Sequence, residues 1–135
     1  MIVYTGGSFD LFHYGHARFL ARCAEIGSVT VALNTDEFIA EYKGRPPIVP
    51  YQGRAEVLRA CRYVDEVVPN TGGADSKPTI EQVAPDIIAI GSDWQERDYH
   101  LQMGFSPAWL ADHRITLLYL PYTDGISSSA IREQL

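Results

Sequence analysis

The chain has 135 residues, of which 46% are apolar and 21% charged, and 17 acidic residues against 11 basic ones give a net charge of −6. This length suits a single domain over residues 1–135, and the apolar content excludes a disordered chain. The negative charge argues against a nucleic-acid binder, which needs a basic surface. The longest apolar runs, such as Ile115–Leu120, are far shorter than the ~20 residues that a membrane span requires.

Cysteine usage and the N-terminus both indicate a cytoplasmic protein. Cys23 and Cys61 lack the CxxC spacing and fall in helix-like segments, so we expect two reduced, buried thiols instead of a disulfide. The sequence Met1-Ile2-Val3-Tyr4 leads directly into a strand-like run, with no basic region or cleavage site of a secretory signal.

Short β-rich runs alternate with helical stretches along the whole chain. We expect strands at Ile2–Thr5, Val29–Leu33, Glu66–Val68, Ile87–Ile90 and Ile115–Leu120. Helices are expected at His16–Ile26, Asp36–Tyr42, Tyr51–Cys61, Thr79–Val83, Pro107–Asp112 and from the Ser127–Ser129 cap to Gln134. Strands that are apolar throughout are typical of a parallel sheet covered on both faces. The order predicts an α/β fold: a doubly wound, Rossmann-like parallel sheet of about five strands with helices on both faces.

Ligands bind such sheets at the carboxyl ends of the strands, which here are followed by unusual segments. After the first strand, Gly6-Gly7-Ser8-Phe9-Asp10 leads into His13-Tyr14-Gly15-His16. The glycines let the backbone approach a ligand, and the helix start offers free N–H groups to an anion. Each histidine could donate a hydrogen bond to a phosphate oxygen. Zinc is disfavoured, because zinc-binding helices prefer a spacing of four and no third ligand lies nearby, so we predict no protein-held metal site.

Basic residues are concentrated in one part of the sequence. Five of the eleven lie within twenty positions, with Glu56 as the only acid among them: Lys43, Arg45, Arg54, Arg59 and Arg62. Such a cluster in an acidic protein suits a small anion, but a solvated basic helix face would have the same composition. The two prolines in Lys43–Pro47 predict a loop without regular structure there.

Two separated motifs resemble one known family. The residues from Gly7 to His16 resemble the GxFDxxHxGH signature of the nucleotidyltransferases related to class I aminoacyl-tRNA synthetases, and Gly125–Arg132 resembles that family's second motif. Arg62–Val67, Gly91–Trp94 and Leu120-Pro121 resemble its cytidylyltransferase branch. Within that branch, the resemblance to the glycerol-3-phosphate cytidylyltransferases covers essentially the whole chain in the same order.

The resemblance implies roles for the matching residues. His13 and His16 would bind the nucleotide phosphates and stabilise the transferring phosphoryl group, with Lys43 and Arg62 as further phosphate-contacting catalytic residues. The nucleotide would be held by Gly7, Ser8, Phe9, Asp93, Thr123, Ser127 and Ser128. The acceptor would be bound by Ser8, Asp10 and Lys43.

Each of these residues also has a simpler structural interpretation. Ser127–Ser129 could form only a helix N-cap, and Arg62 could pair with Asp65 or Glu66 at the surface. Lys43 could be a solvated loop charge, and Asp93 a capping residue beside a core Trp94.

One position departs from the family pattern. Tyr122 stands where cytidylyltransferases acting on glycerol, choline or ethanolamine phosphate commonly have an arginine. Either Arg132 or a residue of the Lys43–Arg54 stretch supplies the missing charge, or the nucleotide is bound differently. The segment Gln102–His113, with Trp109, also departs from that pattern.

The implied reaction transfers CMP from CTP to a polyol or alcohol phosphate, with glycerol 3-phosphate favoured, and releases pyrophosphate. The acceptor phosphate, with a second pKa of ~6, is already a dianion at neutral pH, so no general base is assigned. Mg²⁺ would bridge the triphosphate through phosphate oxygens and water. Adenylyl transfer from ATP and a non-catalytic nucleotide-binding module are the alternatives, and the resemblance implies a homodimer that binds neither nucleic acid nor membrane.

Overall fold

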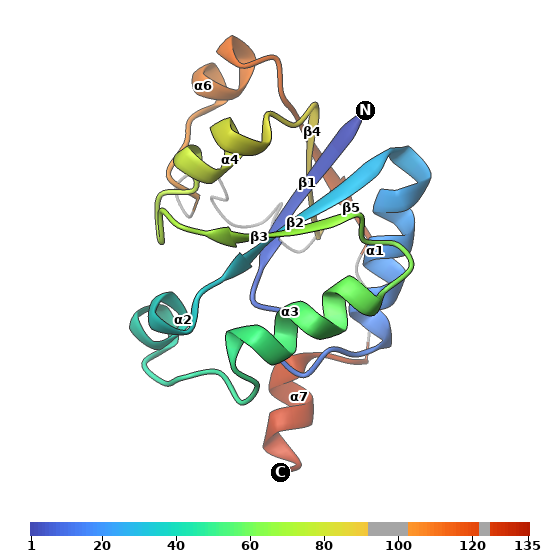
Figure 1. Cartoon of the computed structure of the whole chain (residues 1–135), viewed down its shortest axis with the longest axis vertical. Helices are drawn as coiled ribbons and strands as arrows, with labels where there is room; N and C mark the ends of the chain where they lie inside the picture. The colour runs from blue at the N-terminus through green and yellow to red at the C-terminus, as the bar shows by residue number, and fades with distance from the viewer. Residues whose placement is uncertain (92–102, 122–124) are drawn as a thin grey trace.

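The protein is built on one five-stranded, all-parallel sheet with helices on both sides, as predicted (Figure 1). The computed structural model describes residues 1–91, 103–121 and 125–135. The strands, in the spatial order β3-β2-β1-β4-β5, are β1 (Ile2–Gly7), β2 (Ser28–Asn34), β3 (Glu66–Asn70), β4 (Ile87–Gly91) and β5 (Thr116–Leu120). The helices are α1 (Tyr14–Ile26), α2 (Asp36–Lys43), α3 (Tyr51–Ala60), α4 (Lys77–Val83), α6 (Pro107–Asp112) and α7 (Ser128–Glu133).

Two apolar cores lie on opposite faces of the sheet, because successive strand residues point to opposite sides. On one face, Val3 and Val31 belong to a buried cluster with Leu20 of α1 and Leu58 of α3. On the other face, the neighbouring residues Tyr4 and Ala32 pack in a second cluster with Ile80 of α4 and Leu110 of α6. Helices α1 and α3 therefore cover one face and α4 and α6 the other. None of the helices that the described residues form is long and apolar enough to cross a membrane.

Several element boundaries differ from the prediction for identifiable reasons. Lys43 is the last residue of α2 and not part of a loop, because Gly44, with φ of 74°, adopts the left-handed conformation that ends the helix. Strand β3 continues through Pro69 to Asn70, which the sheet accommodates because β3 is an edge strand. Both cysteines are free, as predicted, but only Cys23 is buried, whereas Cys61 is half-buried.

The parallel arrangement brings the carboxyl ends of the strands to one edge of the sheet. Gly6 and Gly7 at the end of β1 pair with Ala32 and Leu33 of β2, and β4 ends at Gly91 on the other side of β1. The predicted site residues that end or directly follow β1, Gly7, Ser8 and Phe9, lie at this edge.

Candidate active site

The His13–His16 motif forms the first turn of α1. His13 is the N-cap residue, and its Nδ1 accepts a hydrogen bond from the backbone N–H of Gly15 at 3.1 Å. His16 closes the reciprocal bond, because its Nδ1 accepts from the backbone N–H of His13 at 3.1 Å. The two rings stack with centroids 3.8 Å apart. The pair is therefore a capping box built from two imidazoles.

This cap fixes the tautomer of both histidines. A neutral imidazole has one acceptor and one donor nitrogen, so an Nδ1 that accepts a bond leaves the proton on Nε2. Burial, together with the neighbouring His13, lowers the pKa of His16 to about 3, and burial also lowers the pKa of His13. Both rings are thus neutral at pH 7 and present Nε2–H donors. A bound polyphosphate would raise both pKa values and favour the imidazolium form.

The glycine of the motif is required by close packing. A Cβ at Gly15 would lie 2.9 Å from Cε1 and 3.0 Å from Nδ1 of His13, and 3.2 Å from Cγ2 of Ile126. A side chain at this position would push the His13 ring from its place, which explains the glycine between the two histidines.

The loop between β1 and α1 is held in a strained conformation. Phe9 and Leu11 have positive φ angles of 47° and 53°, a region that non-glycine residues adopt rarely and that is enriched at functional sites. The ring of Phe9 packs against His16 with centroids 5.1 Å apart.

Asp10 connects three distant segments of the chain. Its carboxylate accepts hydrogen bonds from the backbone N–H of Ile48 at 2.8 Å and Val49 at 2.9 Å, and from Arg132 of α7 at 2.5 Å. Burial alone would raise the pKa of Asp10, but these donors together lower it. The Ser128 hydroxyl also donates to the Asp10 carbonyl, at 2.5 Å. Both carboxylate oxygens are therefore already bonded, and acceptor binding by Asp10 stays a prediction.

Arg54 is a buried structural residue, although composition suggested either an anion site or a solvated helix face. The residue is 2% exposed, and its side chain donates to the backbone carbonyls of Ser8 and Asn34, each at 2.9 Å, and of Val49 at 2.8 Å. It also contacts the Asp36 carboxylate at 2.6 Å. Arg54 thus braces the loop after β1 against the end of β2, and its donors are engaged by protein groups.

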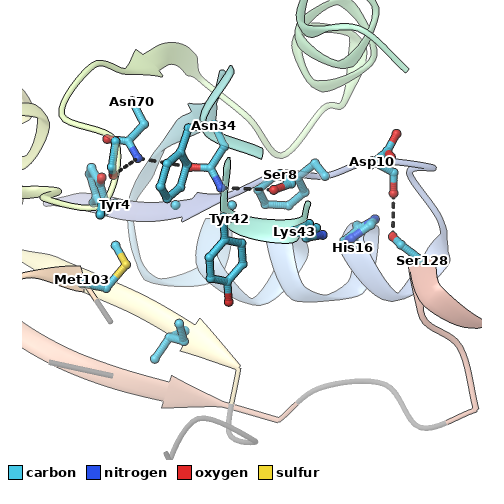
Figure 2. Close-up of a pocket in the computed structure, with 17 residues that line it drawn as sticks. Tyr4, Ser8, Asp10, His16, Asn34, Tyr42, Lys43, Asn70, Met103 and Ser128 are labelled. Atoms are coloured by element: carbon cyan, nitrogen blue, oxygen red, sulfur yellow. Dashed lines mark hydrogen bonds between the residues drawn. The ribbon is translucent and has the colours of Figure 1, made fainter. Parts of the chain in front are cut away.

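A chain of side-chain hydrogen bonds crosses the ends of β3, β2 and β1 (Figure 2). Asn70 donates to Asn34 at 3.1 Å, and Asn34 donates to the Ser8 hydroxyl at 3.1 Å. Ser8 Oγ accepts this bond, and Ser8 lines both cavities described below, so its hydroxyl can still donate to a bound ligand. Asn34 and Asn70 were not among the predicted site residues, although each is the last residue of its strand.

Two cavities flank the end of β1. One, of about 350 Å³, is lined by the histidine pair together with Gly7, Ser127 and Ser128. The other, of about 330 Å³, is lined by Lys43 of α2, by Asn34 and Asn70, and by Tyr4 and Met103. Both are also lined by Gly6–Phe9, His16, Ile90 and Ser128. A group at His16 would therefore be within reach of ligands in both cavities.

The structure brings most of the predicted residues to these cavities. Gly7, Ser8, Phe9, His13, His16, Lys43, Ser127 and Ser128 line at least one of them, and so does Asp10. The hydroxyl of Ser127 also caps α7, accepting from the Ala130 N–H at 3.0 Å, so the simpler interpretation holds for that group as well. Arg62 lines neither cavity and has its guanidinium 5.7 Å from the Tyr63 ring, so its phosphate contact stays a prediction. Asp93, Thr123 and Tyr122 lie outside the described residues.

Arg132 and the Lys43–Arg54 stretch are the two candidate sources of the charge that Tyr122 does not supply. Arg132 is bound to Asp10, and Arg54 within the Lys43–Arg54 stretch is bound to Asp36. Lys43 lines the cavity, and its partial desolvation together with Arg132 lowers its pKa. Lys43 is therefore the residue of that stretch placed to meet an anion.

The parallel sheet and the histidine capping box at the start of α1 agree with the nucleotidyltransferase class that the motifs predicted. The Cytidylyltransferase-like family model matches residues 4–134, and the chain belongs to this family.

Relatives within the family carry two different names. An FAD synthase of Pyrococcus abyssi is 48% identical over 98% of this chain and 90% of its own length. A glycerol-3-phosphate cytidylyltransferase of Bacillus subtilis is 34% identical over 98% of this chain and 95% of its own. A solved structure, the lipopolysaccharide core biosynthesis protein from Thermoplasma volcanium, has the same fold, with a TM-score of 0.72 and 24% identity over 92% of this chain and 98% of that one.

Proposed function

We propose that this enzyme transfers CMP from CTP to a small phosphorylated alcohol, with glycerol 3-phosphate favoured, and releases pyrophosphate. The observation that carries the proposal is the pair of cavities sharing Gly6–Phe9, His16 and Ser128. The cavity beside His13 and His16 would take the triphosphate, and the cavity beside Lys43 would take the acceptor phosphate. The α-phosphate would then lie between them, next to His16.

The chemistry assigned to the chain is positioning and charge stabilisation. The acceptor dianion attacks the α-phosphorus, its P–O bond forms as the bond to pyrophosphate breaks, and no proton needs to be removed. Phosphoryl oxygens would accept hydrogen bonds from the Nε2–H groups of His13 and His16 and from the hydroxyl of Ser8 as charge shifts toward the leaving group. Lys43 would offset the repulsion between the two anions, and Asp93, Thr123, Ser127 and Ser128 would hold the nucleotide. Arg62, which lines neither cavity, would contribute a further phosphate contact.

Mg²⁺ belongs to the proposal as a partner of the triphosphate. The described residues contain no group of three or more His, Cys, Asp or Glu side chains arranged to hold a metal. The ion would be held mainly by phosphate oxygens and water, which is how Mg²⁺ commonly binds with nucleotides. It would supply charge neutralisation on the β- and γ-phosphates.

A second candidate is adenylyl transfer from ATP to a larger phosphorylated acceptor. It is favoured by the FAD synthases of Pyrococcus abyssi and Pyrococcus horikoshii, which are 48% and 40% identical to this chain over 134 residues. Forming FAD this way requires flavin mononucleotide as the acceptor.

Pyrophosphate release decides between the two candidates. CTP and ATP are each combined with glycerol 3-phosphate and with flavin mononucleotide, and kcat/KM is measured for all four pairs. We expect CTP to be preferred by at least about 10²-fold, because a pocket built for one base edge leaves polar groups unpaired with another. Asp93→Ala should weaken nucleotide binding if Asp93 reads the base. An ATP preference would overturn the cytidylyl proposal, and no turnover with any pair would favour the non-catalytic module.

We further propose that the enzyme is a cytoplasmic homodimer that binds neither nucleic acid nor membrane. Sedimentation of the purified protein tests the dimer directly.

A further inference from the structure

The hydroxyl of Tyr4 is buried without a hydrogen-bond partner. Tyr4 lies in the middle of β1 with 0% of its surface exposed, and no described residue is bonded to its Oη. Burial raises its pKa, so the hydroxyl stays protonated and can donate. An unsatisfied buried polar group is destabilising, and native proteins contain few of them. The hydroxyl is therefore a donor that a bound ligand could use.

The hydroxyl of Tyr4 adjoins the cavity that Lys43 also lines. Tyr4, Gly6 and Met103 all line this cavity. A Cβ at Gly6 would stand 3.7 Å from Tyr4 Oη and 3.6 Å from the terminal methyl of Met103, so the missing side chain leaves room between the two. Methionine is unbranched and adapts easily, so a ligand could displace that methyl and reach the hydroxyl.

The neighbouring polar side chains are already engaged. Asn70 donates to Asn34 and to the Gly73 carbonyl, both at 3.1 Å, and accepts from Thr79 at 3.4 Å. Asn34 accepts that bond and donates to Ser8. Among the described residues that line this cavity, Tyr4 is thus the one with a buried side-chain donor that has no partner.

The cavity has two chemically different ends (Figure 2). His16, Asp10 and Ser128 lie at one end, with Lys43 and Ser8 toward the middle, whereas Tyr4 and Met103 lie at the other. A phosphate at the His16 end would point the rest of the acceptor toward Tyr4.

We propose that Tyr4 determines acceptor specificity, by hydrogen bonding to a hydroxyl or carbonyl at the end of the acceptor remote from its phosphate. This inference rests on the proposed function and names the acceptor class: phosphate monoesters with a polar distal group, as opposed to alkyl phosphates. Both glycerol 3-phosphate and flavin mononucleotide have such groups.

Tyr4→Phe tests the inference by removing one hydroxyl and retaining the ring. With glycerol 3-phosphate as acceptor, we expect kcat/KM to fall about 3- to 10-fold, the scale of one neutral hydrogen bond. With propyl phosphate, which lacks both hydroxyls, the variant and the wild type should be equal, and KM for CTP should not change. The thermal midpoint of the ligand-free variant should rise, because an unsatisfied buried group is lost. Tyr119→Phe, on β5, is the matched control and should leave acceptor kinetics unchanged.

The possible outcomes separate this inference from the proposed function. Equal losses with glycerol 3-phosphate and propyl phosphate, or no loss with either in an active enzyme, would overturn the role of Tyr4 alone. A lowered thermal midpoint with unchanged kinetics would also overturn it, because the hydroxyl would then be satisfied in the free protein. If the wild type used flavin mononucleotide instead, the same loss is expected with that acceptor. A wild type that released no pyrophosphate with any acceptor would overturn the proposed function and the inference together.

Discussion

Gly15→Ala should lower the catalytic rate of this enzyme while leaving its free energy of unfolding nearly unchanged. The new Cβ would lie 2.9 Å from Cε1 and 3.0 Å from Nδ1 of His13, closer than atoms in proteins normally approach. The imidazole must shift by several tenths of an ångström or rotate away. Either movement lengthens the cap bond from the Gly15 N–H and turns the Nε2–H of His13 from its position.

The two effects on stability nearly cancel. Loss of an N-cap bond costs about 1 kcal/mol, and alanine in place of glycine in a helix regains about 0.5–1 kcal/mol. The free energy of unfolding should therefore stay within about 1 kcal/mol of the wild type. Catalysis has no such compensation, because a misplacement of about 1 Å can cost about 10²-fold. We expect kcat to fall about 10- to 100-fold.

The assay is pyrophosphate release at saturating CTP and acceptor, with chemical denaturation measured on the same preparations. The double variant His13→Ala/Gly15→Ala is the control: if Gly15 acts through His13, the glycine substitution should add almost nothing to the loss caused by His13→Ala. Fully additive losses, or a Gly15→Ala variant with wild-type kcat, would refute this account of the motif.

Three further predictions concern the same site. His16→Ala and His13→Ala should each lower kcat by at least about 10²-fold, because each removes a donor to the transition state. The control His113→Ala should leave kcat unchanged. Near-normal turnover in folded His13 and His16 variants would exclude phosphoryl transfer at this motif. Lys43→Ala should lower kcat/KM for the acceptor and change the free energy of unfolding by no more than about 0.5 kcal/mol, so a large loss of stability on denaturation would make Lys43 a structural residue. Folding lowers the pKa of His16 from 6.5 to about 3, so between these pH values the unfolded chain binds more protons than the folded protein. The free energy of unfolding should therefore fall by about 1–2 kcal/mol from pH 7 to pH 5. Denaturation of His16→Ala should show a smaller fall.

Local sequence patterns were sufficient for much of the architecture. The alternation of apolar strands and amphipathic helices predicted the parallel sheet, because period and strand composition depend on neighbouring residues. The histidine site could also be predicted from the sequence, because the capping bonds that orient it involve only His13, Gly15 and His16. Lys43 illustrates the limit at element ends: the prolines suggested a loop, but Gly44 ends the helix one residue after it.

The partners of the buried polar groups were decided by the tertiary structure. Asp10 bonds Arg132 across 122 positions, and Asn34 bonds Asn70 across 36. Residues this far apart in the sequence come into contact because parallel strands bring their carboxyl ends to one edge of the sheet. Composition placed Arg54 in a basic cluster that suited either an anion site or a solvated helix face. In the structure Arg54 is buried, and the carbonyls of Ser8 and Asn34 and the carboxylate of Asp36 compensate its charge. The sequence predicts Tyr4 only as a residue of the first strand. Its unpaired hydroxyl beside the cavity follows from the tertiary packing of Gly6 and Met103 next to it.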